Sequence, residues 1–170
     1  MIKARLFGDK ISSNSEEAFT MYEKTRWGEK KEGIIEYTGV EALFLVSEKK
    51  MEIFLGKKEI NYEGLMKKLK KNDKKIETKF IVFSDLRRKG YIVKTALKFG
   101  AEFRIYEKGV KPGEDHAKWI LYCVKESEHL NWHDFVAKNR VAHSTKKNLL
   151  LGIVDEEGDV TYYEVGWARP

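Results

Sequence analysis

The chain has 170 residues, 42% of them hydrophobic, and a formal net charge of +6. This length allows one medium-sized domain or two small ones, with enough apolar residues for a packed core. No apolar run approaches the roughly 18 residues that a membrane-spanning helix needs, and the first residues lack the apolar segment of a signal peptide. The sequence therefore predicts a cytoplasmic protein without a membrane anchor.

The charge pattern suggests both a type of partner and a habitat. A basic surface attracts phosphate groups, so nucleic acid is a reasonable partner, although a solvated lysine-rich surface explains the charge equally well. Lys and Glu abound and Gln is absent, which is typical of proteins from hot environments. The single cysteine, Cys123, excludes an internal disulfide and is predicted to be a buried, unreactive thiol.

The first residues alternate short strands with capped helices. Residues 1–12 predict one or two strands, and Ser13 to Ser15 offer caps for the helix that follows. Residues 34–37 predict a strand after a charged loop. Thr38 and Glu41 form a capping-box pattern that predicts another helix.

A third helix and a domain boundary follow. Residues 51–54 predict a strand, and Asn61 caps a lysine-rich helix. The basic run at 67–75 is interpreted as a solvated helix end and linker rather than an RNA contact. We place the boundary there, which gives a small mixed α/β N-terminal domain at 1–75 and a C-terminal domain at 76–170.

The second half predicts a helix, three strands, a helix and two strands. The first helix is indicated by Phe80, Ile81, Phe83 and Leu86. Two paired strands turn at Gly100, and the apolar run 119–124 predicts a central strand. Asn131 caps a helix whose predicted apolar face holds Trp132, Phe135, Val136 and Val141. A final hairpin joins 149–154 to 160–165. This order indicates an α/β (α+β) fold with a mixed sheet flanked by helices.

Three separated residues have the functional groups that metal-free RNA cleavage needs. Tyr106 ends a strand-like run, His116 follows a loop containing Gly and Pro, and Lys147 lies between a helix and an apolar strand. A phenol can take a proton, an imidazole can give one, and an ammonium group can stabilise charge on phosphate oxygens. The adjacent Glu114 and Asp115 favour a protonated imidazole. Taken alone, each residue is equally explained as an ordinary surface or strand-end side chain.

Longer segments resemble the catalytic domain of archaeal tRNA-splicing endonucleases. They are DLRRKGYIVKT at 85–95, KFGAEFRIY at 98–106, RVAHSTKK at 140–147 and IVDEEGDVTYY at 153–163. The resemblance is strong from about residue 76 onward and implies a nuclease-like C-terminal domain. It also implies catalytic roles for Tyr106, His116 and Lys147, and selects Lys147 rather than Lys146.

The resemblance implies a substrate and a reaction. The protein would cut precursor tRNA at both splice sites of a bulge-helix-bulge element, without metal or cofactor, leaving 2′,3′-cyclic phosphate and 5′-hydroxyl ends. Because two cuts need two sites, the chain would form a homotetramer, a dimer of dimers. A heterotetramer with a separate structural chain stays open. The alternative function is a basic RNA-binding subunit without activity, whose three residues would lie too far apart to share a phosphate.

Two further groups of residues gain roles from the resemblance. Arg140 and Trp167 match positions that clamp a flipped-out bulge base, although Trp167 is also explained as a core or subunit-interface residue. The acidic loop would dock into a basic pocket of a neighbouring subunit; its acids are Asp155, Glu156, Glu157 and Asp159. The remaining histidines lack a metal-binding pattern, and His143 is expected to brace the active site or pack beneath it.

Overall fold

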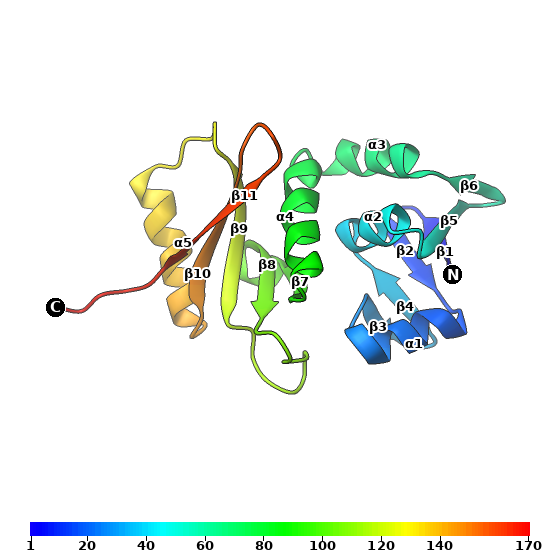
Figure 1. Ribbon diagram of the computed structural model, residues 1–170, viewed down its shortest axis with the longest axis horizontal. Helices are drawn as coiled ribbons and strands as arrows, with labels where there is room; N and C mark the ends of the chain where they lie inside the picture. The colour runs from blue at the N-terminus through cyan, green and yellow to red at the C-terminus, as the bar shows by residue number, and fades with distance from the viewer. The chain divides into compact units, whose positions relative to one another are not determined.

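The computed structural model describes residues 1–170, and its contacts divide the chain into two compact units, Met1–Phe80 and Ile81–Pro170 (Figure 1). The division falls inside helix α4 (Ile76–Arg88), whereas the sequence places the domain boundary before this helix. No helix in the structure combines the length and apolar character that crossing a membrane requires.

The first unit is a six-stranded sheet with three helices. The sheet order is β3-β4-β2-β1-β5-β6, and only β1 and β5 pair in parallel. The strands are β1 (Ile2–Phe7), β2 (Lys10–Ser13), β3 (Glu29–Lys31), β4 (Ile34–Tyr37), β5 (Met51–Leu55) and β6 (Lys58–Ile60), and the helices are α1 (Glu16–Thr25), α2 (Gly39–Ser47) and α3 (Tyr62–Asn72).

The capping box predicted at Thr38 is confirmed and extends further than expected. The buried carboxylate of Glu41 accepts hydrogen bonds from the backbone N–H groups of Thr38 and Gly28, each at 3.0 Å. Gly28 has a φ of 74°, and a Cβ there would lie 2.4 Å from Ile35. One side chain therefore fixes the start of α2 and the loop before β3.

The second unit is a five-stranded mixed sheet with the order β11-β10-β9-β8-β7. Only β9 and β10 pair in parallel, which requires a crossover connection, and α5 supplies it. The strands are β7 (Ile92–Ala96), β8 (Ala101–Tyr106), β9 (Trp119–Lys125), β10 (Asn148–Val154) and β11 (Val160–Val165), with α5 at Trp132–Ser144 and the short 3₁₀ helix η1 at Leu97–Phe99.

Helices cover both faces of this second sheet, as Figure 1 shows. On one face, Phe83 of α4 packs against Phe103, and Gly152 lets Val82 approach β10. On the other face, Ala142 of α5 joins a buried cluster that includes Ile120 and Leu149. The predicted order of elements and the mixed sheet flanked by helices are confirmed.

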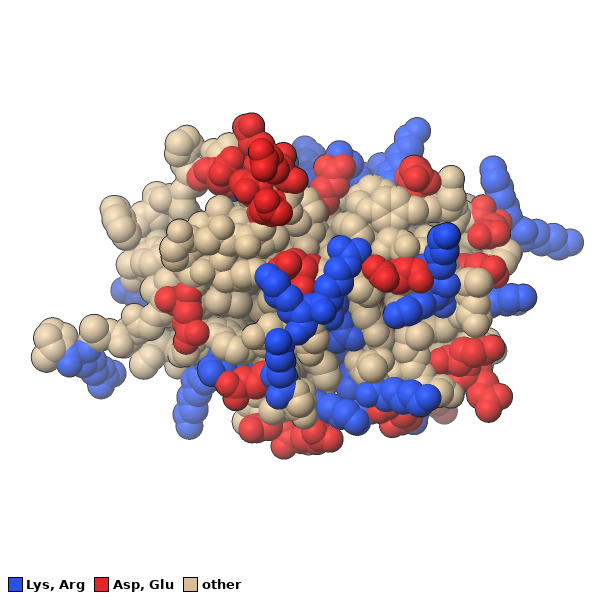
Figure 2. Space-filling view, in the orientation of Figure 1, with Lys and Arg blue, Asp and Glu red and all other residues tan.

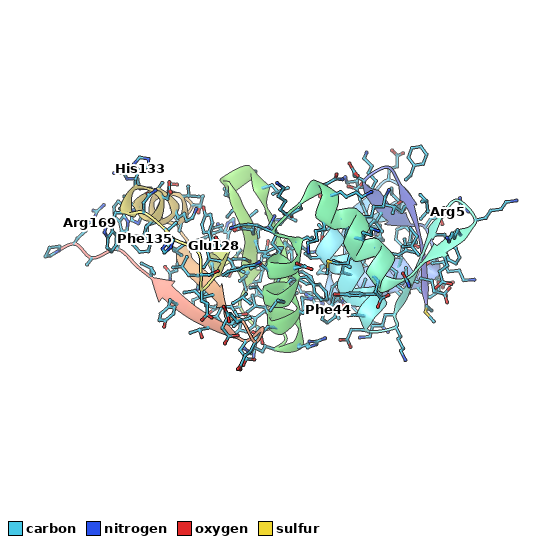
Figure 3. All side chains as sticks on the ribbon, turned by 90° about the horizontal axis from the view of Figure 1, so that it is seen from above. Arg5, Phe44, Glu128, His133, Phe135 and Arg169 are labelled. Atoms are coloured by element: carbon cyan, nitrogen blue, oxygen red, sulfur yellow. The ribbon has the colours of Figure 1, made fainter.

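The apolar face predicted for α5 is wrong at Trp132 and Val136 and correct at Phe135. Trp132 is 80% exposed and Val136 is 41% exposed. Phe135 packs against the buried cluster, while His133 points away from the sheet (Figure 3). The buried positions beyond Phe135 are Asn139 and Ala142, spaced as one helix face. Asn139 satisfies its buried amide by donating to the backbone carbonyl of Phe135 at 3.0 Å, so a polar residue occupies a core position.

Candidate active site

The three predicted catalytic residues meet where the central strands of the second sheet, β8, β9 and β10, end or begin. Tyr106 is the last residue of β8, and the loop at 107–118 leads from it through His116 into β9. Lys147 immediately precedes β10, whose first residue is in register with the first residue of β9. Because β8 and β9 pair in antiparallel fashion, the end of β8 lies beside the start of β9. The sheet topology therefore gathers residues that are far apart in sequence.

Tyr106, His116 and Lys147 line a single open pocket of about 460 Å³. Tyr106 is held firmly, because only 5% of its surface is exposed. His116, by contrast, lies on an exposed stretch of the loop. The pocket therefore combines a nearly buried phenol with a more accessible imidazole.

The acidic residues beside His116 bind backbone groups of the loop rather than its imidazole. Asp115 Oδ1 accepts from the backbone N–H of His116 at 2.7 Å. Glu114 Oε2 accepts from the backbone N–H of Lys111 at 3.2 Å. Both carboxylates also line the pocket. Through these contacts both carboxylates shape the loop that carries His116.

A left-handed turn selects which lysine enters the pocket. Lys146 has a φ of 55°, is exposed and does not line the pocket, whereas Lys147 does. The ammonium group of Lys147 donates to the backbone carbonyl of Thr145 at 3.0 Å. It also lies 5.7 Å from the centroid of the Phe99 ring. These contacts hold the charge at the pocket wall.

Lys147 belongs to a group of three positive side chains, which we name the cationic cluster: Lys98, Arg104 and Lys147. Burial lowers the pKa of the Lys147 ammonium group, and the charges of Arg104 and Lys98 lower it further. The cluster therefore favours an anion in the pocket, because an anion offsets the mutual repulsion. Sequence reasoning missed Arg104, although strand alternation places it on the same face as Tyr106.

The proposed base clamp lies outside this pocket. Arg140 is exposed on α5, and neither Arg140 nor Trp167 lines the pocket. Trp167 is 51% exposed and stacks on His143. The guanidinium carbon of Arg169 lies 6.0 Å from the Trp167 ring centroid. His143 is exposed and does not line the pocket either, so it does not pack beneath the active site.

The acidic loop is a well-ordered hairpin turn. Asp155 Oδ1 accepts from the backbone N–H groups of Glu157 and Asp159, each at 2.9 Å. Glu156, Glu157 and Asp159 are exposed, and acidic side chains gather on the molecule around the β10–β11 turn (Figure 2). The loop thus presents concentrated negative charge on a rigid frame. No group of three or more His, Cys, Asp or Glu side chains, in this loop or in the rest of the chain, is placed to hold a metal ion.

Two family models match the chain. Residues 76–162 match the tRNA intron endonuclease, catalytic C-terminal domain, and residues 2–66 match the tRNA intron endonuclease, N-terminal domain. Both the pocket and the acidic loop fall within the first match. The second match covers most of the first compact unit.

Curated archaeal proteins match along nearly the whole chain. The tRNA-splicing endonuclease of Thermococcus gammatolerans is 38% identical over 170 residues, covering 99% of each chain. That of Pyrococcus horikoshii is 38% identical over 169 residues, covering 99% of this chain and 97% of the relative. That of Nanoarchaeum equitans is 39% identical over 137 residues, covering 77% of this chain and 88% of the relative.

Proposed function

Because this chain belongs to the tRNA intron endonuclease family, whose members cleave RNA, we propose that it excises introns by cutting both splice sites of a bulge-helix-bulge element in precursor tRNA. The observation that carries the proposal is the pocket shared by Tyr106, His116 and Lys147. An inactive RNA-binding subunit is the alternative, and it requires these side chains to lie apart. Their shared pocket favours the enzyme.

The proposed reaction uses the RNA itself as nucleophile. Tyr106 takes the proton of the 2′-hydroxyl beside the scissile phosphate, and the 2′-oxygen forms a bond to phosphorus. The bond from phosphorus to the 5′-oxygen breaks, and His116 gives that oxygen a proton. The products carry a 2′,3′-cyclic phosphate and a 5′-hydroxyl. Because the nucleophile is internal, the reaction needs neither a metal ion nor water.

Lys147 has an electrostatic role in this mechanism. Negative charge builds on the non-bridging phosphate oxygens as the pentacovalent state forms, and a preorganised cation stabilises it. The contact of the Lys147 ammonium with the Thr145 carbonyl supports this role, because it fixes the charge before the substrate arrives. The other members of the cationic cluster add to the field that attracts the phosphate.

The proposed assembly is a homotetramer. Each chain has one pocket with the full triad, while a bulge-helix-bulge element presents two cleavage sites in fixed register. Two chains would cut and two would hold them in place through the acidic loop. A heterotetramer in which this chain is the catalytic partner stays open. The exposed acids at the β10–β11 turn support docking onto a basic surface.

The test is cleavage by the purified protein alone in excess EDTA. A bulge-helix-bulge RNA should be cut at both splice sites, and mass spectrometry should find cyclic phosphate on the 5′ fragment. The matched control is the same RNA with a deoxynucleotide before each scissile phosphate, which lacks the nucleophile and should stay intact. Cleavage of that control, or a need for a divalent ion, would contradict the mechanism. Absence of cleavage together with tight RNA binding would favour the inactive subunit.

A further inference from the structure

Arg104 occupies the candidate active site without any partner of its own. It lies in β8 two residues before Tyr106, so both side chains leave the strand on the same face, and both line the pocket. The Arg104 Nε group is buried and has no hydrogen-bond partner. No carboxylate of the chain forms an ion pair with its guanidinium, so its donors are available to a ligand in the pocket.

An unpaired guanidinium here is costly. A buried donor without an acceptor destabilises the folded protein, and the cost is larger when the group is charged. An arginine stays charged in proteins, so it cannot escape this cost. This arrangement destabilises the empty site, and an anionic ligand would reverse the effect.

The acids of the pocket do not provide that anion. Glu114 and Asp115 accept hydrogen bonds from loop backbone N–H groups. A guanidinium presents a planar set of donors that matches two oxygens of one phosphate, whereas an ammonium acts as a point charge. The pocket therefore combines one directional phosphate binder, Arg104, with one compact charge, Lys147. The phosphate that can reach both is the one facing Tyr106 and His116.

Building on the function proposed above, we propose that Arg104 is a fourth catalytic residue that binds the non-bridging oxygens of the scissile phosphate. The planar set of guanidinium N–H donors orients the phosphorus between the phenol of Tyr106 and the imidazole of His116. Lys147 then stabilises the charge that develops as the 2′-oxygen attacks. The arginine would contribute both in-line alignment and charge, which explains why the pocket holds a cation beyond the triad.

The experiment compares Arg104→Gln and Arg104→Lys with wild type in single-turnover cleavage at saturating RNA. Loss of a preorganised donor to a developing oxyanion slows reactions by roughly 10²–10³-fold, so Arg104→Gln should slow cleavage by about 10²-fold. Arg104→Lys should recover only part of the rate, because it restores the positive charge without the planar set of N–H donors. Lys125→Gln is the matched control, since it removes an exposed positive charge of the same unit outside the pocket and should cut at nearly the wild-type rate.

A second measurement separates contact from packing. Replacing one non-bridging oxygen of the scissile phosphate by sulfur should slow wild type, and in Arg104→Gln this sulfur effect should largely disappear. Free guanidinium should partly rescue Arg104→Ala but not Lys147→Ala. Cooperative thermal unfolding at or above the wild-type melting temperature confirms that each variant is folded.

Two results would overturn this inference alone. One is that wild type cuts and that the cleavage rate of Arg104→Gln lies within about twofold of the wild-type rate. The other is a variant that loses only RNA affinity and keeps its rate at saturation, which would place Arg104 on a flanking phosphate. A wild-type protein that does not cut would instead overturn the proposed function, and this inference with it.

Discussion

The indole of Trp167 stacks on the imidazole of His143, with ring centroids 3.9 Å apart and planes inclined by 11°. His143 is near the end of α5, and Trp167 follows the last strand. The stack holds the exposed indole at a defined place on the second unit. A ring fixed in this way is a suitable platform for a nucleobase, because less freedom is lost on binding.

The first prediction tests this platform. Trp167→Ala should weaken binding of a bulge-helix-bulge RNA by about 10-fold or more, since base–aromatic stacking contributes roughly 1–3 kcal/mol per base. Trp167→Phe should retain most of the affinity, and Phe7→Ala, which removes an 86% exposed ring from the first unit, serves as the control. Fluorescence anisotropy gives the affinities. A variant that binds normally but changes its oligomeric state would place Trp167 at a subunit interface instead.

The second prediction concerns His116 as the general acid. His116→Ala should slow the chemical step by roughly 10²-fold or more, the usual contribution of a positioned proton donor. RNA affinity should change little, and His129→Ala, at another exposed histidine, should have no effect. A substrate with sulfur in place of the leaving 5′-oxygen needs less protonation and should largely rescue the variant. An equal loss of rate on both substrates would exclude His116 as the acid.

The third prediction concerns the charge of Lys147. Burial and then the charges of Arg104 and Lys98 lower the pKa of its ammonium group, so it should lose its proton at a lower pH than an ordinary lysine. Removing one of these charges with Lys98→Gln should raise the pKa of Lys147. Acetic anhydride labelling as a function of pH, read by mass spectrometry, measures both values. Lys118→Gln is the control, and an unchanged pKa in Lys98→Gln would refute the proposed interaction.

The fourth prediction concerns assembly. Changing Glu156 and Glu157 to Gln and Asp159 to Asn removes exposed charge but leaves Asp155, which organises the turn. If the loop docks on a basic surface, light scattering should show dimers in place of tetramers, and cleavage of paired splice sites should fail. Raised salt should shift wild type in the same direction, because exposed charges are screened over about 8–10 Å.

A control completes this experiment. The exposed acids Glu29 and Glu59 of the first unit can be neutralised together with Glu32, which gives the same change in net charge away from the loop. This control variant should remain tetrameric. If the loop variant also remains tetrameric and cuts normally, the loop is only a turn, and the tetramer contacts lie elsewhere.

Most of the sheet in the second unit could be predicted because its strands are strongly apolar. The runs at 119–124 and 149–154 are flanked by helices on both faces, so they lack polar alternation and stand out in the sequence. The short strands β3 and β6 were missed. Their residues are mostly charged and exposed, and only ladder hydrogen bonds to β4 and β5 define them as strands.

The residues that line the pocket were predictable only in part. The resemblance to a known family selected Tyr106, His116 and Lys147, and the structure places all three around one pocket. Arg104 carries no comparable sequence signal, because an arginine in a strand usually faces solvent. The stack of His143 on Trp167 joins residues whose contact depends on the path of the chain after β11, which no local pattern specifies.

The parallel pairing of β9 with β10 sets the time at which this pocket first exists. A growing chain that has reached β9 already contains Tyr106 and His116, yet Lys147 arrives only after α5 has been made and has crossed over the sheet. Crossover pairings of this kind form slowly, because distant segments must meet first. The nascent polypeptide should therefore be inert toward the RNA that surrounds it during translation, and should become a nuclease only when β10 has paired with β9.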